Sequence, residues 1–123
     1  MQPMGSGHRQ VRSLRLAQEF QEEIALIIQR QLKDPRMGFV TITRVELSRD
    51  GSHAKVFFSC LGGIDERTRS QEALDHAAPF IYGLIKKRFH IKVIPQLSFC
   101  YDESIARSIE ISSMLDRLNE PSS

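Results

Sequence analysis

The sequence predicts a single two-layer α+β domain, in the order helix, strand, strand, kinked helix pair, strand, helix. Apolar residues recur at spacings of three and four before residue 33 and after residue 64, which is typical of helices that bury one face. Two strand-like runs flank an Asp50-Gly51 pair, a strong signal for an antiparallel hairpin. A third strand-like run follows the second helical stretch, so it should lie parallel to the second strand. A small mixed sheet with helices on one face satisfies all three observations.

The first helix is expected over residues 9–33, with an apolar stripe at every third or fourth position. The stripe consists of Leu16, Phe20, Ile24, Ile27, Ile28 and Leu32. Asp34 precedes a proline and leaves helical space, which ends the helix. The hairpin strands then span residues 39–48 and 53–61. Their apolar alternation shifts by one between Ile42 and Val45, which predicts a β-bulge.

The second half of the chain is expected to contain two short helices, a strand and a last helix. Asp65 or Thr68 starts the first of these helices, and a break at Ala77, Ala78 and Pro79 separates it from the second. Pro79 lacks a backbone donor and disfavours helical backbone at the residue before it. The second helix should bury the apolar residues Phe80, Ile81, Leu84 and Ile85.

The third strand is expected over residues 90–101. Pro95 within it indicates an edge position or a bulge, because proline cannot donate to a sheet ladder. Asp102 or Ser104 should cap a C-terminal helix that carries Ile105, Ile109 and Leu118 at helical spacing.

Composition places the chain among ordinary globular proteins, with 41% hydrophobic and 26% charged residues in 123. We expect residues 1–10 to form a flexible N-terminal segment and residues 11–120 to form the domain. The chain has no run of about 20 apolar residues, so no membrane partner is expected. Its first ten residues lack the apolar core of a signal peptide, which predicts a cytoplasmic protein. Cys60 and Cys100 lie in apolar runs and are interpreted as buried thiols of a reducing compartment.

Positive charge is concentrated in the body of the chain. Residues 1–101 contain 15 basic and 10 acidic residues, whereas residues 102–123 contain 2 and 5. The densest basic segment holds Lys86, Lys87, Arg88 and Lys92 within seven residues. Such a segment suits a phosphate backbone, although a solvated helix end has the same composition.

The sequence gives little support to catalysis. His8, His53, His76 and His90 are dispersed, and none stands at a metal-ligand spacing from another ligand. No phosphate-binding glycine loop or nucleophile elbow is present. We therefore expect a binding protein, not an enzyme, without a cofactor and without a metal site.

Three short motifs identify a known family. The turn Asp34-Pro35-Arg36-x-Gly38, the hairpin Ser48-x-Asp50-x-Ser52-x-Ala54-Lys55 and the junction Tyr101-Asp102-x-Ser104 follow one another along the chain. In this order and spacing they resemble the ribosome-binding factor A family, over roughly residues 15–118. The helix–helix–strand unit after the hairpin also resembles a KH domain of type II topology, an RNA-binding module.

The resemblance implies a KH-like ribosome-binding domain that assists maturation of the small ribosomal subunit. The implied partner is the free small (30S) subunit, through its 16S rRNA and possibly its proteins, and the protein is expected to be a monomer. Family members replace the usual GXXG loop with an Ala-x-Gly kink between the helices. In this chain the kink alanine is Ala77, and Pro79 stands where the family has glycine.

RNA contact is therefore expected from the basic segment more than from the kink. The first-rank candidates are Lys86, Lys87, Arg88 and Lys92, and the second-rank candidates along and beyond the first helix are Arg12, Arg15, Arg30, Lys33 and Arg36. Two alternatives stay open at this point. The protein could be a general KH-type module that binds messenger or small RNA, or a protein–protein adaptor that uses the hairpin edge or the last helix.

Overall fold

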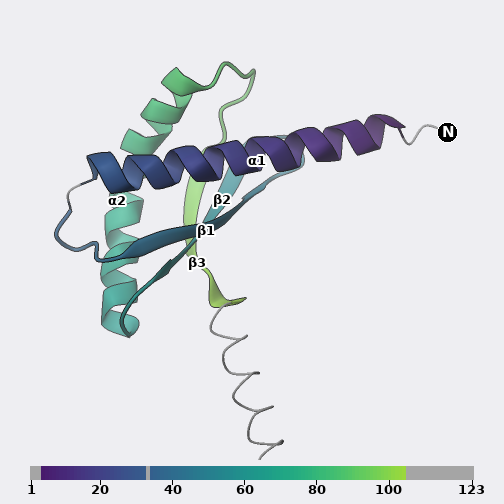
Figure 1. Ribbon diagram of the computed structural model, residues 1–123. Helices are drawn as coiled ribbons and strands as arrows, with labels where there is room; N and C mark the ends of the chain where they lie inside the picture. The colour runs from purple at the N-terminus through teal and green to yellow at the C-terminus, as the bar shows by residue number, and fades with distance from the viewer. Residues whose placement is uncertain (1–3, 33, 105–123) are drawn as a thin grey trace, which may run out of the picture.

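The computed structural model describes residues 4–32 and 34–104 of the chain. Figure 1 shows how its helices and strands are arranged. In chain order these are α1 (Met4–Gln31), β1 (Val40–Leu47), β2 (His53–Cys60), α2 (Ile64–Arg88) and β3 (Gln96–Tyr101). Within the described residues, the order and type of the elements agree with the sequence analysis.

The three strands form one mixed sheet in the order β1-β2-β3. β1 and β2 are antiparallel, and β2 and β3 are parallel, as the helical crossover predicts. β3 is an edge strand, but it is shorter than the predicted span of residues 90–101. It begins directly after Pro95, because the proline has no N–H with which to extend the ladder.

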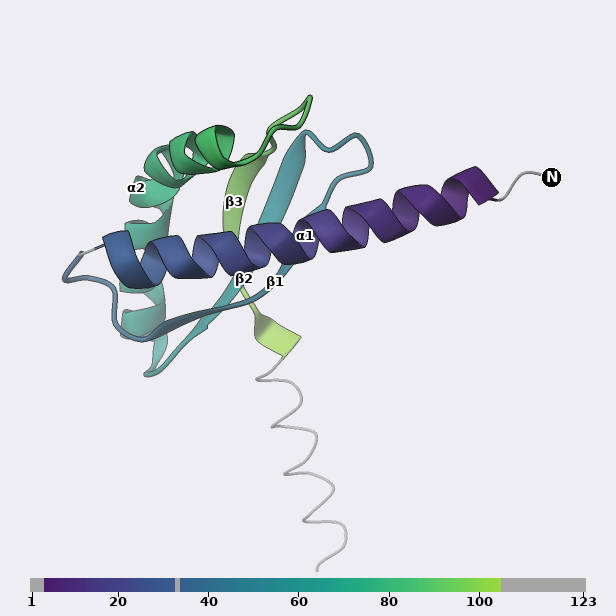
Figure 2. The ribbon, with the colours of Figure 1, turned by 45° about the horizontal axis from the view of Figure 1, so that its top comes forward.

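Both helices cover the same face of this sheet and share one hydrophobic core with it. Alternate β2 residues Ala54, Val56 and Phe58 are buried, while His53 and Lys55 point to the exposed face. Figure 2 shows α1 running across the strands. The helices contribute Phe20, Ile24, Ile27, Ile28, Leu74, Ile81 and Ile85 to the core. The predicted helix periodicity therefore identified the buried stripe of α1.

The predicted pair of helices after the hairpin is instead one helix with a proline inside it. α2 runs from Ile64 to Arg88 and includes Pro79. The helix changes direction along its length in Figures 1 and 2. Pro79 cannot donate to the carbonyl of Asp75, four residues earlier, so it bends the helix without ending it. The start is also earlier than Asp65 or Thr68, and Glu66 accepts a hydrogen bond of 2.9 Å from the Gly63 N–H.

Phe80 departs from the predicted burial. Ile81 and Ile85 are buried and Leu84 is half-buried, as expected, but Phe80 keeps 48% of its surface exposed. Four consecutive or near-consecutive apolar residues cannot all face one core from a single helix, since successive side chains point about 100° apart. Phe80 is the one that the helix turns outward.

α1 also begins earlier than predicted, at Met4 rather than near residue 9. It therefore runs through the boundary expected between residues 10 and 11, and residues 4–10 are helical. Once a helix is nucleated, each added residue contributes a hydrogen bond at little further cost. Backbone hydrogen bonds can extend a helix beyond the residues that show apolar periodicity, so the periodicity does not locate its first residue.

The predicted bulge in β1 is confirmed, and two side chains hold it. The register shifts between Ile42 and Arg44. The Gln21 side-chain amide on α1 donates to the carbonyls of Ile42 at 3.4 Å and Thr43 at 3.2 Å. From the other end of the fold, Asp102 accepts a hydrogen bond of 2.6 Å from the Thr43 hydroxyl. The bulge therefore joins α1, β1 and the end of β3.

The Asp50-Gly51 turn closes the hairpin as predicted. Gly51 has φ of 75°, a left-handed conformation that glycine adopts without a steric penalty. The Asp50 carboxylate accepts hydrogen bonds from Ser48 and Ser52, and these bonds lower its pKa from 3.8 to about 2. The Ser-x-Asp-x-Ser motif thus has a structural role in this turn.

Asp102 has the capping position that the sequence indicated for the last helix. Its carboxylate accepts from the Ser104 N–H at 2.9 Å and from the Ser104 hydroxyl at 2.5 Å, and the chain becomes helical at Glu103. Only 4% of the Asp102 surface is exposed. The rest of the predicted C-terminal helix lies outside the described residues.

We predict that Asp102→Ala lowers the free energy of unfolding by about 2–3 kcal/mol. One hydrogen bond to a buried charged group contributes about 1.5–3 kcal/mol, and the exposed Ser104 can bond to water in the variant. Urea denaturation followed by circular dichroism measures the change. Glu72→Ala, at an exposed carboxylate, is the control and should stay within about 0.5 kcal/mol of the wild type.

The same variant tests the pH dependence. Hydrogen bonds from Ser104 and Thr43 hold the pKa of Asp102 below its ordinary 3.8. A lowered folded-state pKa stabilises the fold fully above the unfolded value and loses that effect as the pH falls through the folded value. The difference between the wild type and Asp102→Ala should therefore be constant above about pH 5 and shrink below about pH 4. An unchanged difference at about pH 3 would contradict this role.

Candidate nucleic-acid interface

The predicted basic segment forms an exposed turn at the end of α2. Lys86, Lys87 and Arg88 form the last residues of the helix, Lys92 follows in the loop before β3, and all four are exposed. The three helical residues point about 100° apart, so they present charge around the helix end and not along one stripe. We call these four residues the basic turn. Because these cationic side chains point in different directions, they can contact phosphates on separate segments of an RNA backbone.

The basic turn is held beside the acidic stretch of α1. The Arg88 Nε lies 3.4 Å from Glu23 Oε1. Phe89, directly after α2, packs edge-on against Phe20 of α1 with ring centroids 4.7 Å apart. A hollow of about 540 Å³ lies between these segments, and its lining includes Glu19, Glu22 and His90. The aromatic contact anchors the turn, and the exposed ion pair contributes little stability.

The second-rank cations lie on α1 to either side of this contact. Arg12 and Arg15 are exposed about 12–17 Å along the helix from Glu23 in one direction, and Arg30 is exposed about 10 Å away in the other. The ion pair between Glu23 and Arg88 joins α1 to the basic turn, and these cations lie along α1 on either side of it. Arg36 is exposed in the loop after α1, and Lys33 lies outside the described residues.

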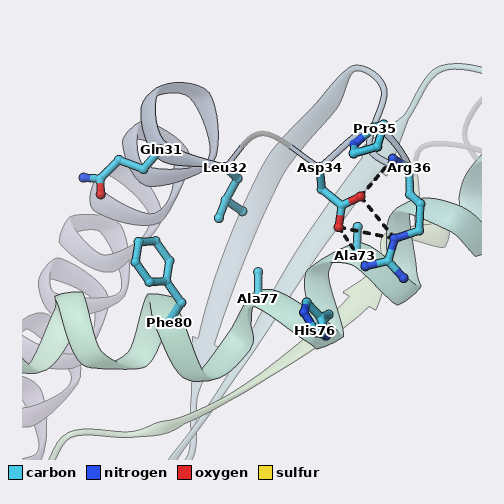
Figure 3. Close-up of a pocket in the computed structure, with 9 residues that line it drawn as sticks. All are labelled: Gln31, Leu32, Asp34, Pro35, Arg36, Ala73, His76, Ala77 and Phe80. Atoms are coloured by element: carbon cyan, nitrogen blue, oxygen red, sulfur yellow. Dashed lines mark hydrogen bonds and ion pairs between the residues drawn. The ribbon is translucent and has the colours of Figure 1, made fainter.

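A second hollow, of about 560 Å³, lies between the end of α1, the loop after it and the middle of α2 (Figure 3). We call it the kink hollow. Its lining residues are Gln31, Leu32, Asp34, Pro35, Arg36, Ala73, His76, Ala77 and Phe80. The small side chains of Ala73 and Ala77 leave the space open, and Phe80 borders one end of it.

An ion pair borders the opposite end of the kink hollow. Arg36 Nη2 lies 2.7 Å from Asp34 Oδ2, and Arg36 Nε donates to Asp34 Oδ1 at 3.1 Å. The Arg36 N–H also donates to Asp34 Oδ1 at 2.9 Å. These bonds lower the pKa of the Asp34 carboxyl from 3.8 to about 2, so it stays ionised. The positive charge of Arg36 is thereby largely compensated, which weakens it as a simple phosphate contact.

The predicted kink residues have different exposures. Ala77 and Ala78 are half-buried against the core, and Pro79 is exposed. None of the three carries a charged or hydrogen-bonding side chain, so their contribution to the site is the bend of α2 itself. Ala77 lines the kink hollow, which makes the bend and the hollow one feature of the fold.

Several residues that organise the sheet and its packing were missed by sequence reasoning. Gln21 and Gln71 are polar residues on helices, and each donates to a strand carbonyl, Gln71 to Phe99 at 2.7 Å. Arg44 lies over the Phe57 ring at 4.0 Å, and Arg67 lies over the Tyr101 ring at 4.1 Å. Sequence spacing carries no signal for contacts between such distant positions.

Metal binding and membrane insertion find no structural basis in residues 4–32 and 34–104. No three His, Cys, Asp or Glu residues of that part of the chain gather as metal ligands. Neither of its two helices combines the length and apolar character that crossing a bilayer requires. Cys60 and Cys100 are free and half-buried, which is a more exposed setting than predicted.

Comparison with known proteins identifies the family. A family model described as ribosome-binding factor A matches residues 12–115. The chain belongs to the ribosome-binding factor A family. The match covers α1 from Arg12 onward and all three strands, so it includes the whole core and the basic turn.

Curated relatives in this family are similar over most of their length. The chain is 43% identical to ribosome-binding factor A of Nitrosomonas europaea over 105 residues, which are 85% of this chain and 90% of the relative. It is also 43% identical to ribosome-binding factor A of Burkholderia cenocepacia strain HI2424 over 108 residues, 88% of this chain and 80% of the relative.

Solved structures of family members have the same fold. A Thermotoga maritima protein solved by NMR, a putative ribosome-binding factor A by its description, is 38% identical, with a TM-score of 0.69 over 76% of this chain and 89% of that one. The crystal structure of ribosome-binding factor A from Thermus thermophilus is 25% identical, with a TM-score of 0.67 over 75% and 97%. A model of the Thermus thermophilus protein has also been fitted into a cryo-EM map of a 30S complex, with a TM-score to this chain of 0.61 at 25% identity over 74% and 96%.

These comparisons confirm two of the sequence predictions. The resemblance drawn from three short motifs is correct, and so is the KH-like α+β fold class. All three motifs are turns in which an aspartate accepts hydrogen bonds from neighbouring residues, at Asp34, Asp50 and Asp102. The residues that identify the family therefore maintain its fold, and they do not by themselves locate the RNA contacts.

We predict that Glu23→Gln strengthens the binding of single-stranded RNA, because it removes the carboxylate that competes with phosphate for Arg88. The slope of log affinity against log salt should steepen by up to about 0.7, the value for one further phosphate contact on a single strand. Fluorescence anisotropy with a labelled oligonucleotide at about 50–300 mM KCl measures both quantities. Glu46→Gln, whose partner Arg44 lies on the sheet at 2.8 Å, is the control.

Proposed function

We propose that this protein binds free small ribosomal subunits and supports late maturation of 16S rRNA. The observation that carries the proposal is the family itself, since relatives 43% identical over 80–90% of their length are named ribosome-binding factor A. The Thermus thermophilus relative has been fitted into a map of a 30S complex, which supports the small subunit as the partner. The exposed basic turn supplies the charge that such a partner requires.

The mechanism we propose is binding without catalysis. A factor of this kind stabilises one conformation of the immature rRNA and leaves when the subunit matures. Such behaviour requires higher affinity for the immature than for the mature state, and a tenfold preference corresponds to about 1.4 kcal/mol. The basic turn would supply affinity without sequence preference, and selectivity would come from the shape of the rRNA that it meets.

We predict that the protein co-sediments with free small subunits on a sucrose gradient at low salt and is depleted from joined ribosomes. Raising the salt from about 50 to about 300 mM should release it, because phosphate contacts weaken steeply with salt. Immunoblotting of the gradient fractions gives the distribution. A protein that stays at the top of the gradient at low salt, and binds messenger or small RNA instead, would contradict the proposal.

We predict that the triple variant Lys86→Glu, Lys87→Glu, Arg88→Glu weakens subunit binding by at least about 100-fold at about 100 mM salt, because each reversal removes one phosphate contact and adds a repulsion. Quantitative co-sedimentation over a range of subunit concentrations measures the affinity. The three positions are exposed, so circular dichroism should report an unchanged fold.

The matched control reverses three other exposed cations, Arg49, Lys55 and Arg69. It changes the net charge by the same amount and leaves the basic turn intact. If both triple variants lose affinity equally, the effect belongs to net charge and the basic turn is not the site. Binding that is insensitive to nuclease and to both variants would favour a protein adaptor.

A further inference from the structure

Three exposed apolar side chains lie at the end of the fold where β2 leads into α2. Phe39, Leu61 and Ile64 keep 79%, 72% and 77% of their surfaces exposed. The Leu61 N–H donates to the Phe39 carbonyl at 3.3 Å, and Ile64 follows Leu61 after two glycines as the first residue of α2. We call these three residues the apolar end. Single exposed apolar residues are ordinary, whereas several at one place mark a contact with another molecule.

The turn that carries the apolar end is defined by short contacts. Gly62 has φ of 112°, and a Cβ at this position would meet the Glu66 side chain at 2.6 Å, so the turn requires glycine. Glu66 also accepts a hydrogen bond of 2.9 Å from the Gly63 N–H, which fixes the turn to the first turn of α2. The backbone therefore positions Leu61 and Ile64 before a partner binds, and such preorganisation lowers the entropy cost of binding.

The charges beside the apolar end favour a protein partner over RNA. The first turn of α2 carries Asp65 and Glu66. The next cations along the helix are already paired, since Arg67 Nη2 lies 2.6 Å from Glu103 Oε1 and Arg69 Nη2 lies 3.9 Å from Glu66 Oε1. Three acidic and two basic residues leave a net charge of −1 here. A phosphate backbone would be repelled from this surface, whereas a protein segment with Lys or Arg would be attracted.

The apolar end and the basic turn lie at opposite ends of α2. The helix has 25 residues, so about 37 Å of helix separates them along its path. Figure 1 shows the end of β2 and the start of α2 at one end of the fold and the end of α2 at the other. Contacts at both ends would fix the orientation of the protein on a large partner.

We propose that the apolar end docks on a protein of the small subunit, through a segment that presents apolar side chains next to Lys or Arg. The basic turn binds rRNA, so partners of different chemistry hold the two ends of α2. This inference rests on the proposed function, because it takes the small subunit as the partner. The apolar contact contributes affinity that salt does not screen, in contrast to phosphate contacts.

Site-specific photo-crosslinking of the full chain identifies the occupant. One variant carries p-benzoylphenylalanine in place of Phe39, a second in place of Leu61, and the matched control in place of Leu14, which is 72% exposed on α1. Each variant is bound to purified small subunits, irradiated and analysed by mass spectrometry. We expect the first two variants to crosslink to the same subunit protein, at a peptide with apolar residues beside Lys or Arg. The Leu14 variant should give no crosslink to that protein.

Salt dependence separates an apolar contact from an RNA contact. The double variant Phe39→Ser, Leu61→Ser should weaken subunit binding by at least about tenfold, the scale for truncating apolar anchors of an interface. The slope of log affinity against log salt should stay that of the wild type, because no phosphate contact is removed. Binding of a short oligouridylate to the double variant, and subunit binding of the control Leu14→Ser, should stay within about twofold of the wild type. The substituted side chains are exposed, so circular dichroism should report an unchanged fold.

Several outcomes would overturn the inference. Crosslinks from Phe39 and Leu61 positions to rRNA, to a second copy or within the same chain would each identify another occupant, and their complete absence would show that the apolar end is free on the subunit. A double variant with wild-type affinity, or with a reduced salt slope, would also contradict it. In all these cases the wild type still co-sediments with subunits, and the proposed function stands. Failure of the wild type to co-sediment overturns the proposed function and this inference with it.

Discussion

The missing N–H of Pro79 is the constraint on which the arrangement of the site depends. Its absence bends α2 beyond the segment that Gln71 ties to β3. The bend directs the second half of the helix over α1, where Phe89 packs on Phe20 and Arg88 meets Glu23. The same bend leaves Ala77 and Phe80 beside the loop after α1, so the basic turn and the kink hollow both follow from one residue.

Aspartate-centred turns supply the second organising principle of this fold. Asp34 accepts hydrogen bonds within the loop after α1, Asp50 closes the hairpin and Asp102 joins the end of β3 to the β1 bulge. Each carboxylate accepts bonds from residues close in sequence, and each has a lowered pKa for that reason. Because such turns need particular residues at fixed short spacings, they appear as motifs, whereas a basic surface has no required spacing.

The electrostatic layout pairs opposite charges where the elements meet and leaves cations exposed elsewhere. The acidic stretch of α1 faces the basic turn, which lowers the repulsion among Lys86, Lys87 and Arg88 in the free protein. When RNA binds, its phosphates can likewise reduce the repulsion among these cations. A phosphate would then replace Glu23 as the partner of Arg88. The Asp34–Arg36 pair is more tightly bonded, so Arg36 is less available for exchange to a phosphate.

The sequence by itself determined the element order, the hairpin, the bulge, the buried stripe of α1 and the family, because each depends on residues close together in the chain. Periodicity over residues 16–32 reports burial directly, and the Asp-Gly turn needs only its own four residues. The predicted boundaries of α1 and β3 were less accurate. Where a helix begins, and where a strand stops pairing at Pro95, depends on backbone hydrogen bonds that periodicity does not report.

Only the tertiary structure decided which side chains share a surface. Proline was expected to divide α2 into two helices, but packing on both the sheet and α1 keeps it one bent helix. Phe80 was expected in the core, and the helix turn places it at the kink hollow. The second-rank cations were predicted along and beyond the first helix, and the length of α1 separates Arg12 and Arg15 from Arg30. Contacts of this kind join residues tens of positions apart, and no local pattern encodes the angle at which two helices meet.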